Sequence, residues 1–255
     1  MNYSAIPLFK SHYSLGKSIL TLAKAGSSEP DEPSSVIDIA KKLKLDKVHL
    51  VDDSISGFLE GYKSCEDAKM QFRFGLRLTV CDDINNKTAE SKDKEHKVIV
   101  FIRNSEGYKN LIKISTIAST NGFYYHPRID CKTLKELWNE DNLVLCIPFY
   151  DSYVFKNNLT YSICVPDFSF CKPIYFAEDN NLPFDVILNR KIDEIVSDKA
   201  AIIKTQSIYY ENKEDFLAYL TFRCISNRTT LNKPNLEHCS SNEFCAESFK
   251  DKYGK

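Results

Sequence analysis

Short apolar runs alternate with helical patterns about seven times along this chain, and this alternation most limits how it can fold. The expected strands cover residues 6–9, 49–51, 72–80, 98–102, 143–149, 173–177 and 200–205. The expected helices cover residues 18–24, 36–43, 57–69, 133–138, 184–195 and 213–225, with one more between a cap at 104–105 and an end at 121–122. The pattern predicts right-handed βαβ units and a mostly parallel sheet, either open or closed into a barrel.

Composition excludes several classes of protein. With 43% apolar and 27% charged residues, the 255-residue chain is globular rather than disordered. Its net charge of -1 provides no overall basic field for nucleic acid, so that partner is only weakly supported. No run of about 20 apolar residues predicts a membrane span.

The cysteines and the first residues indicate a cytoplasmic protein. The nine cysteines are an odd number without a CxxC pair, which argues against a disulfide framework or a zinc ribbon. The only group of residues that suggests a metal site is His238 and Cys239 with Cys245. The simpler interpretation is that these cysteines are scattered reduced thiols. The sequence MNYSAIPLFKSHYS lacks the apolar segment of a signal peptide.

The stretch KVIVFIRNSEGYKNLIKISTIASTNGFYYHPRID, residues 97–130, holds the most information. Its apolar run at 98–102 predicts a strand buried on both faces, and Asn104 or Ser105 then caps a helix. Asn121 and Gly122 end that helix, and a loop rich in aromatic residues with His126 and Arg128 follows.

This stretch resembles the PHP (polymerase and histidinol phosphatase) domain of the bacterial DNA polymerase III alpha subunit, in NSEGYKNLIKIS and then GFYYHPRID. Weaker similarity extends to PLFKSHYSL, KVHLVDDSISGFLEGYK, FRFGLRLTV and TQSIYYENKEDFLAYLTFRCISNRTTLNKPN. The resemblance implies an α/β fold, a distorted (β/α)7 PHP-type barrel. We expect a single domain over residues 1–255, with polar loops at about 26–35 and 82–97 and a polar tail from about 227.

PHP enzymes hold metal ions with His, Asp and Glu side chains and use them for phosphoester hydrolysis. The resemblance implies that most of these ligands are replaced here. Asp52 survives, and the other positions correspond to Leu8, Lys10, Lys17, Asp53, Arg77, approximately Phe149, Gln206 and Ile208. The prediction is therefore no metal, no cofactor and no catalytic residue.

The replaced positions bring cations into the expected site. Lys10, Lys17 and Arg77 could neutralise Asp52 and Asp53 by ion pairs, or could join Arg128 in a site for anions. Simpler interpretations exist for each group. The two aspartates then only end a strand or cap a helix, and the arginine only stacks on Tyr124 or Tyr125.

Three hypotheses about function follow. The leading one is a non-catalytic, PHP-like accessory or interaction protein of DNA replication, which binds a polymerase or a proofreading exonuclease. The second is a metal-dependent phosphoesterase or exonuclease with a rearranged site that uses Asp52, Asp53, His12 or His126. The third is a module that binds a phosphate group or a DNA end.

Overall fold

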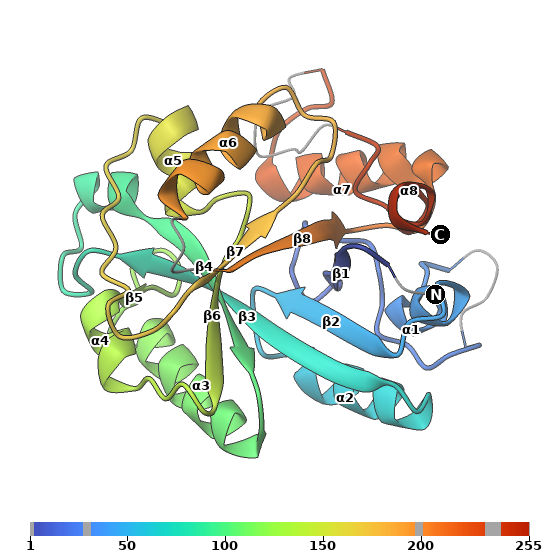
Figure 1. Ribbon diagram of the computed structural model, residues 1–255, viewed down its shortest axis with the longest axis horizontal. Helices are drawn as coiled ribbons and strands as arrows, with labels where there is room; N and C mark the ends of the chain where they lie inside the picture. The colour runs from blue at the N-terminus through green and yellow to red at the C-terminus, as the bar shows by residue number, and fades with distance from the viewer. Residues whose placement is uncertain (1–2, 28–31, 197–200, 233–240, 255) are drawn as a thin grey trace. The chain divides into compact units, whose positions relative to one another are not determined.

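The computed structural model describes residues 3–27, 32–196, 201–232 and 241–254 (Figure 1). The chain forms two compact units. The first unit comprises residues 1–74, 178–185 and 204–255, and the second comprises residues 75–177 and 186–203. Both combine strands with helices, so the predicted mixed α/β class, that of a PHP-type barrel, is confirmed. The prediction of a single domain over residues 1–255 stays a prediction, and His238 with Cys239 lies outside the described residues.

Three strands of the first unit run parallel. β1 (Ile6–Phe9) pairs with β2 (Lys47–Asp52) on one side and with the last residues of β8 (Ala201–Ile208) on the other. Leu8 lies opposite His49, and Phe9 lies opposite Ile208. Because parallel strands end at the same edge, the residues that follow β1 and β2 lie next to each other there.

Helices of the first unit begin and end where local sequence favours it. They are α1 (Val36–Lys42), α2 (Phe58–Asp67), α7 (Phe216–Asn227) and α8 (Ala246–Tyr253), with a 3-10 turn η2 (Lys213–Asp215) before α7. The Ser35 side chain accepts a hydrogen bond from the amide of Ile37 and caps α1. The predicted helices at 36–43, 57–69 and 213–225 are confirmed to within a few residues.

The predicted helix at residues 18–24 is wrong, because this segment is extended. The amide of Thr21 donates to the carbonyl of Ser34, and the Thr21 carbonyl accepts from the amide of Val36. Leu20 and Leu22 are buried. The backbone groups that a helix would pair internally are therefore used between neighbouring segments.

The end of the chain is less polar than predicted. Phe244 and Phe249 are fully buried, and residues from Ala246 form α8, whose cap is Cys245. In α7 the buried face includes Tyr219, whereas Leu217 is 63% exposed.

The second unit contains strands of both directions. β6 (Leu143–Ile147) is parallel to β7 (Ile174–Ala177), and β5 (Ile129–Asp130) is parallel to the end of β3 (Gln71–Cys81). β4 (His96–Ile102) departs from the predicted parallel order, because it is antiparallel to both β3 and β6. No α-helix lies between β3 and β4, so the chain turns back without the crossover that a parallel pair needs.

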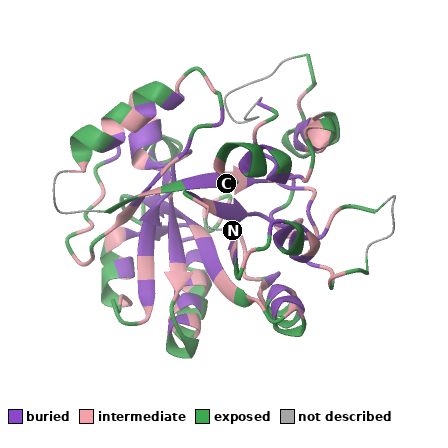
Figure 2. Ribbon diagram, turned by 45° about the vertical axis from the view of Figure 1, so that its right-hand side comes forward, coloured by how far each residue is buried: buried purple, intermediate pink, exposed green. Residues whose placement is uncertain are grey.

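The helices of the second unit are α3 (Ser105–Ser119), α4 (Cys131–Glu136), α5 (Tyr153–Leu159) and the greater part of α6 (Asp185–Ile195). Asn104 caps α3 by accepting from the amide of Gly107, as predicted. A side chain at Gly122 would place its Cβ 1.9 Å from the Arg128 carbonyl oxygen, so only glycine fits where this helix ends. Figure 2 shows buried strands and helices with exposed outer faces.

The predicted polar loop at 82–97 is only partly a solvated connection. It contains a 3-10 helix, η1 (Glu90–Lys94), and then enters β4. Glu95 and His96 are buried. The polar composition of this segment did not predict the burial of Glu95. A glutamate can be buried when a cation is buried with it.

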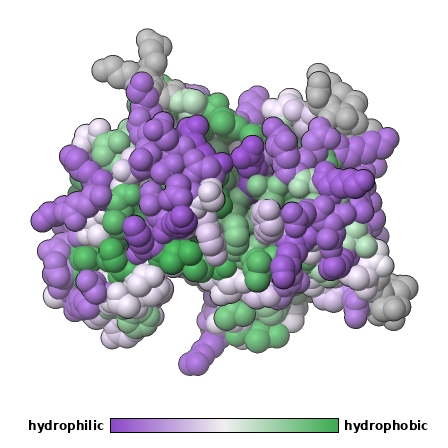
Figure 3. All heavy atoms as spheres, turned by 90° about the horizontal axis from the view of Figure 1, so that it is seen from below, coloured by the Kyte–Doolittle hydropathy of each residue, from purple (hydrophilic) through white to green (hydrophobic). Residues whose placement is uncertain are grey.

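The face of the molecule shown in Figure 3 is mostly polar. Hydrophilic side chains predominate on the face shown in Figure 3, with smaller apolar areas between them. Among the described residues, no helix is both long enough and apolar enough to span a bilayer.

Candidate functional site

Lys10, Lys17 and Asp53 form one ion-pair cluster in the first unit. Lys10 directly follows β1, and Asp53 directly follows β2. The Nζ atoms of Lys10 and Lys17 lie 3.2 Å and 3.3 Å from Oδ2 of Asp53. The Lys10 side chain is only 6% exposed, whereas that of Lys17 is 35% exposed. The structure therefore brings three of the six predicted site residues together, with two cations on one carboxylate.

Asp52 lies beside this cluster and has a different set of partners. It is fully buried at the end of β2. Its Oδ1 accepts from the Ser11 amide at 2.9 Å and the Ser14 hydroxyl at 2.8 Å, and its Oδ2 accepts from the Ser11 hydroxyl at 2.6 Å. The Ser14 hydroxyl oxygen also accepts from the amide of Asp53. Asp52 thus fixes the loop after β1 against the end of β2.

The other first-unit positions that the resemblance assigns to metal ligands, Leu8, Gln206 and Ile208, carry neither an imidazole nor a carboxylate. Leu8 and Ile208 are buried in the core. Gln206 is fully buried, and its Nε2 donates to the carbonyl oxygen of Glu243. An amide used in this way supports the chain near α8 rather than an open site.

Arg77 has its own partner in the second unit. Its guanidinium lies 2.6 Å from Oδ2 of Asp151, and its side chain is 10% exposed. Asp151 follows β6, and nearby Phe149 is buried. Arg77 is therefore neutralised by a carboxylate that the sequence did not single out.

Arg128 is buried in the second unit and is surrounded by acceptors. None of its surface is exposed. It donates to the carbonyls of Gly122 and Asn86, to the hydroxyl of Ser91 and to Oε1 of Glu95, at 3.1–3.3 Å. This arrangement holds the segments at residues 86–95 and 122–128 together. Arg128 in this position does not present its guanidinium to an outside phosphate.

Glu95 connects Arg128 with His126. Its Oε2 lies 2.8 Å from Nε2 of His126. Burial alone would raise the pKa of Glu95, but the hydrogen bonds and charges of His126 and Arg128 outweigh burial and hold that pKa below its ordinary value. His126 is therefore engaged as a partner of Glu95.

The two tyrosines of the same loop stack with cations. The guanidinium of Arg128 lies 5.0 Å from the centre of the Tyr124 ring, and Nζ of Lys92 lies 3.5 Å from that of Tyr125. Tyr125 has a φ of 62° and is 72% exposed. The predicted stacking of Arg128 on a tyrosine is present, and it is on Tyr124.

Lys10, Lys17 and Asp52, which the resemblance assigns to ligand positions, do not fit a metal ion. An ammonium group at Lys10 or Lys17 repels a cation, and both oxygens of Asp52 already accept hydrogen bonds from Ser11 or Ser14. Transition metals need converging imidazole and carboxylate ligands. Within the described parts of the chain, no group of three His, Cys, Asp or Glu residues is arranged to hold a metal.

Sequence reasoning missed several residues that define these clusters. Ser11 and Ser14 bind Asp52, Asp151 pairs with Arg77, and Glu95 pairs with Arg128. Both serines lie in the motif PLFKSHYSL, directly after the first expected strand, and Asp52 and Asp53 end the second. Parallel pairing of these two strands would have predicted that the serines lie close to the aspartates. Glu95 had no local signal, since it lies in a run of charged residues.

Comparison with known families agrees with this fold. A model of the PHP domain matches residues 28–162, just over half of the chain. The chain therefore belongs to the PHP domain family.

Its relatives include bacterial replicative polymerase subunits. The DNA polymerase III subunit alpha of Aquifex aeolicus is 31% identical over 185 residues, which cover 68% of this chain and 16% of that protein. The subunit of Helicobacter pylori is 34% identical over 97 residues, covering 38% of this chain and 8% of the relative. That of Treponema pallidum is 23% identical over 228 residues, covering 84% and 19%. The chain thus spans less than a fifth of the length of these relatives.

Proposed function

We propose that this protein is a non-catalytic PHP-like accessory protein of DNA replication, which binds a polymerase or a proofreading exonuclease. The observation that carries the proposal is the cluster of Lys10, Lys17 and Asp53. Where PHP enzymes use ligands for metal cations, this chain has two ammonium groups paired with one carboxylate.

The cluster supports a structural role for the former site. A largely buried ammonium such as that of Lys10 needs a nearby negative charge, which Asp53 supplies. Side-chain cations then provide the positive charge that metal ions provide in the enzymes. This neutralises the site from within and stabilises the fold without binding a metal.

The partner is inferred from the relatives. They are alpha subunits of DNA polymerase III, a much longer protein than the matched segment. A chain that resembles one domain of such a subunit is suited to bind the partner proteins of that domain, such as a proofreading exonuclease. It could equally bind the polymerase subunit itself.

The other two hypotheses have less support. A rearranged phosphoesterase would need His12 or His126 to act with Asp52 and Asp53, but the His126 ring contacts Glu95 and the His12 ring packs on Tyr13. A phosphate site would need Arg128, which is buried among acceptors.

Metal titration tests the non-catalytic part of the proposal. The metal-stripped protein is titrated with Mn²⁺ and with Zn²⁺ by calorimetry, and retained metal is then measured by elemental analysis. We expect no stoichiometric binding, because Lys10 and Lys17 place positive charge where an ion would need ligands. Binding of one or more ions that is lost in Asp53→Asn but kept in Asp151→Asn would overturn the proposal. Phosphoesterase and exonuclease assays would then follow.

Purified replication proteins test the partner. The alpha subunit and the proofreading exonuclease of the organism that encodes this chain are each mixed with it and analysed by sedimentation. We expect a complex with at least one of them, with a Kd of about 10 μM or tighter, in the range of transient interfaces. An unrelated protein of similar charge serves as the control. If neither protein sediments with the chain at about ten times that concentration, the accessory role is wrong.

A further inference from the structure

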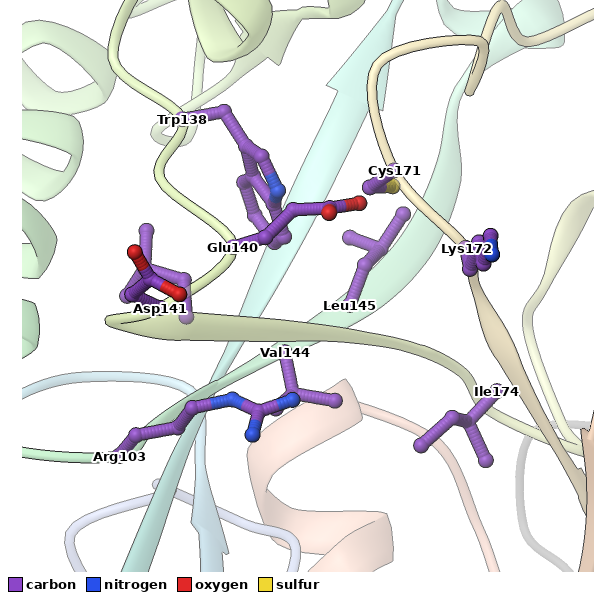
Figure 4. Close-up of a pocket in the computed structure, with 10 residues that line it drawn as sticks. Arg103, Trp138, Glu140, Asp141, Val144, Leu145, Cys171, Lys172 and Ile174 are labelled. Carbon is purple, nitrogen blue, oxygen red and sulfur yellow. The ribbon is translucent and has the colours of Figure 1, made fainter.

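A pocket in the second unit is lined by none of the site residues described so far. Its volume is about 320 Å³, at the lower end of the range found for small-molecule sites. It is lined by Arg103, Trp138, Glu140, Asp141, Leu143, Val144, Leu145, Cys171, Lys172 and Ile174 (Figure 4). These residues include the first ones of β6 and β7, whereas Phe149 and Asp151 follow the other end of β6.

The pocket has an apolar side. Val144 and Ile174 come from the paired strands β6 and β7 and lie on the same face of the sheet. Leu145, the next residue of β6, lies on the opposite face, and Figure 4 shows the two side chains on opposite sides of the strand. Trp138 lines the pocket after α4, and its ring lies 5.4 Å from that of Phe170 in an edge-to-face contact. Neighbouring strands therefore fix the apolar surface, and an aromatic contact holds the indole.

Four charged side chains of both signs surround this surface. Glu140 and Asp141 come from the connection before β6, Arg103 follows β4, and Lys172 precedes β7. In Figure 4, Asp141 and Lys172 lie at opposite sides, with Val144 and Leu145 between them. Glu140 points across the pocket toward Cys171, and Arg103 extends toward Val144.

These four charges do not neutralise one another. In the described residues, none of the four side chains takes part in an ion pair, although ion pairs are frequent elsewhere in the chain. Two carboxylates and two cations thus remain available around one apolar surface. A ligand that carries both charges could pair with both sets at once, whereas a phosphate would be repelled by Glu140 and Asp141.

We propose that this pocket binds a small zwitterion of the amino-acid class with an apolar side chain. Its ammonium group would pair with Glu140 or Asp141, and its carboxylate with Arg103 or Lys172. The apolar side chain would then lie against Val144 and Ile174, which share one face of the sheet. This inference does not depend on the proposed replication role.

The test uses the fact that Trp138 is the only tryptophan of the chain. Its fluorescence therefore reports on this pocket alone. The intact protein is titrated with L-leucine and with L-phenylalanine, and the same titrations are repeated by calorimetry. We expect a saturable change in emission with a Kd below about 1 mM, since small ligands gain little binding energy in total.

Capped ligands separate the two charges. N-acetyl-L-leucine lacks the ammonium group, and L-leucinamide lacks the carboxylate. We expect each to bind about tenfold more weakly than L-leucine, which is the effect of one charged hydrogen bond. Equal binding of the free and capped ligands would overturn the proposal, as would no binding of either amino acid up to about 10 mM by both methods.

Matched variants locate the ligand. Arg103→Gln and Glu140→Gln each remove one charge at similar size, and we expect about tenfold weaker binding of L-leucine in both. Lys109→Gln is the control, because Lys109 lies on α3 in an exposed pair with Glu106 and does not line the pocket. A loss of affinity in Lys109→Gln as large as in the pocket variants would contradict the assignment. Denaturation curves of all variants show whether each remains folded.

Discussion

Replacement of Arg128 by alanine is expected to lower the free energy of unfolding by about 3–5 kcal/mol. The guanidinium is fully buried and donates to four groups, among them the carboxylate of Glu95. The variant leaves that carboxylate buried without its cation and leaves the carbonyls of Gly122 and Asn86 without a donor. Breaking one side of a buried pair costs more than the pair contributes, because the remaining charge stays desolvated. Urea denaturation followed by circular dichroism measures the change.

His126→Ala is the control for this prediction. His126 contacts the same carboxylate, but its side chain is 41% exposed, so water can replace it. We expect a loss below about 1 kcal/mol. If Arg128→Ala costs no more than His126→Ala, the buried network does not stabilise the fold in the way that its geometry indicates.

The dependence of stability on pH should change in the same variant. The pKa of Glu95 is lower in the folded protein than its ordinary value of 4.5. A lowered pKa contributes stability that is fully present above the unfolded value and is lost as the pH falls through the folded one. The contribution of Glu95 should therefore begin to fall near pH 4.5 in the wild type and disappear once the pH is below the folded pKa, and it should be smaller in Arg128→Ala.

Replacement of Asp52 by alanine is expected to cost about 3–4 kcal/mol. Asp52 is fully buried, and its two oxygens accept three hydrogen bonds from Ser11 and Ser14. Alanine would leave these buried donors without acceptors and would open a small cavity. Thermal and urea unfolding of the purified variant would measure the effect.

The control for Asp52 is Asp67→Ala. Asp67 pairs with Lys24 at 2.7 Å, but both side chains are more than half exposed. Exposed ion pairs contribute little, and we expect a loss below about 1 kcal/mol. A small effect of Asp52→Ala, comparable to that of Asp67→Ala, would mean that Asp52 is kept for a reason other than stability.

These expectations bear on how the former site is used. Asp52 is the position at which the resemblance predicts a retained metal-ligand aspartate, and it accepts hydrogen bonds from the loop that contains Ser11 and Ser14. Asp53 has become the carboxylate that neutralises Lys10 and Lys17. Both aspartates therefore have structural roles that do not require hydrolysis.

Much of the fold was predictable because the relevant signals are local. Asn104 caps α3, Ser35 caps α1, and Gly122 ends a helix where a Cβ would meet a carbonyl. Apolar runs such as residues 98–102 identified buried strands because strands are short and their side chains alternate between two faces. The family resemblance of residues 97–130 extended these local signals to a fold type, and the PHP match confirms it.

The failed predictions involved segments whose hydrogen bonds are not local. Residues 18–24 have a sequence that allows a helix, but their amides and carbonyls pair with the segment at 34–36 and with other neighbours. Residues 82–97 and 241–254 read as polar, yet Glu95, Phe244 and Phe249 are buried. A sequence pattern does not show which distant segment will cover a residue.

The sequence by itself determined the family, the caps of helices such as α1 and α3, and the presence of Lys10, Lys17, Arg77 and Arg128, since each follows from residue types at local spacing. Only the tertiary structure decided how those cations are used. Lys10 and Lys17 share Asp53, Arg77 pairs with Asp151, and Arg128 is enclosed with Glu95. The physical reason is that a charge leaves water only where the fold supplies an opposite charge or hydrogen-bonding groups, and those partners lie 33 to 74 positions away along the chain.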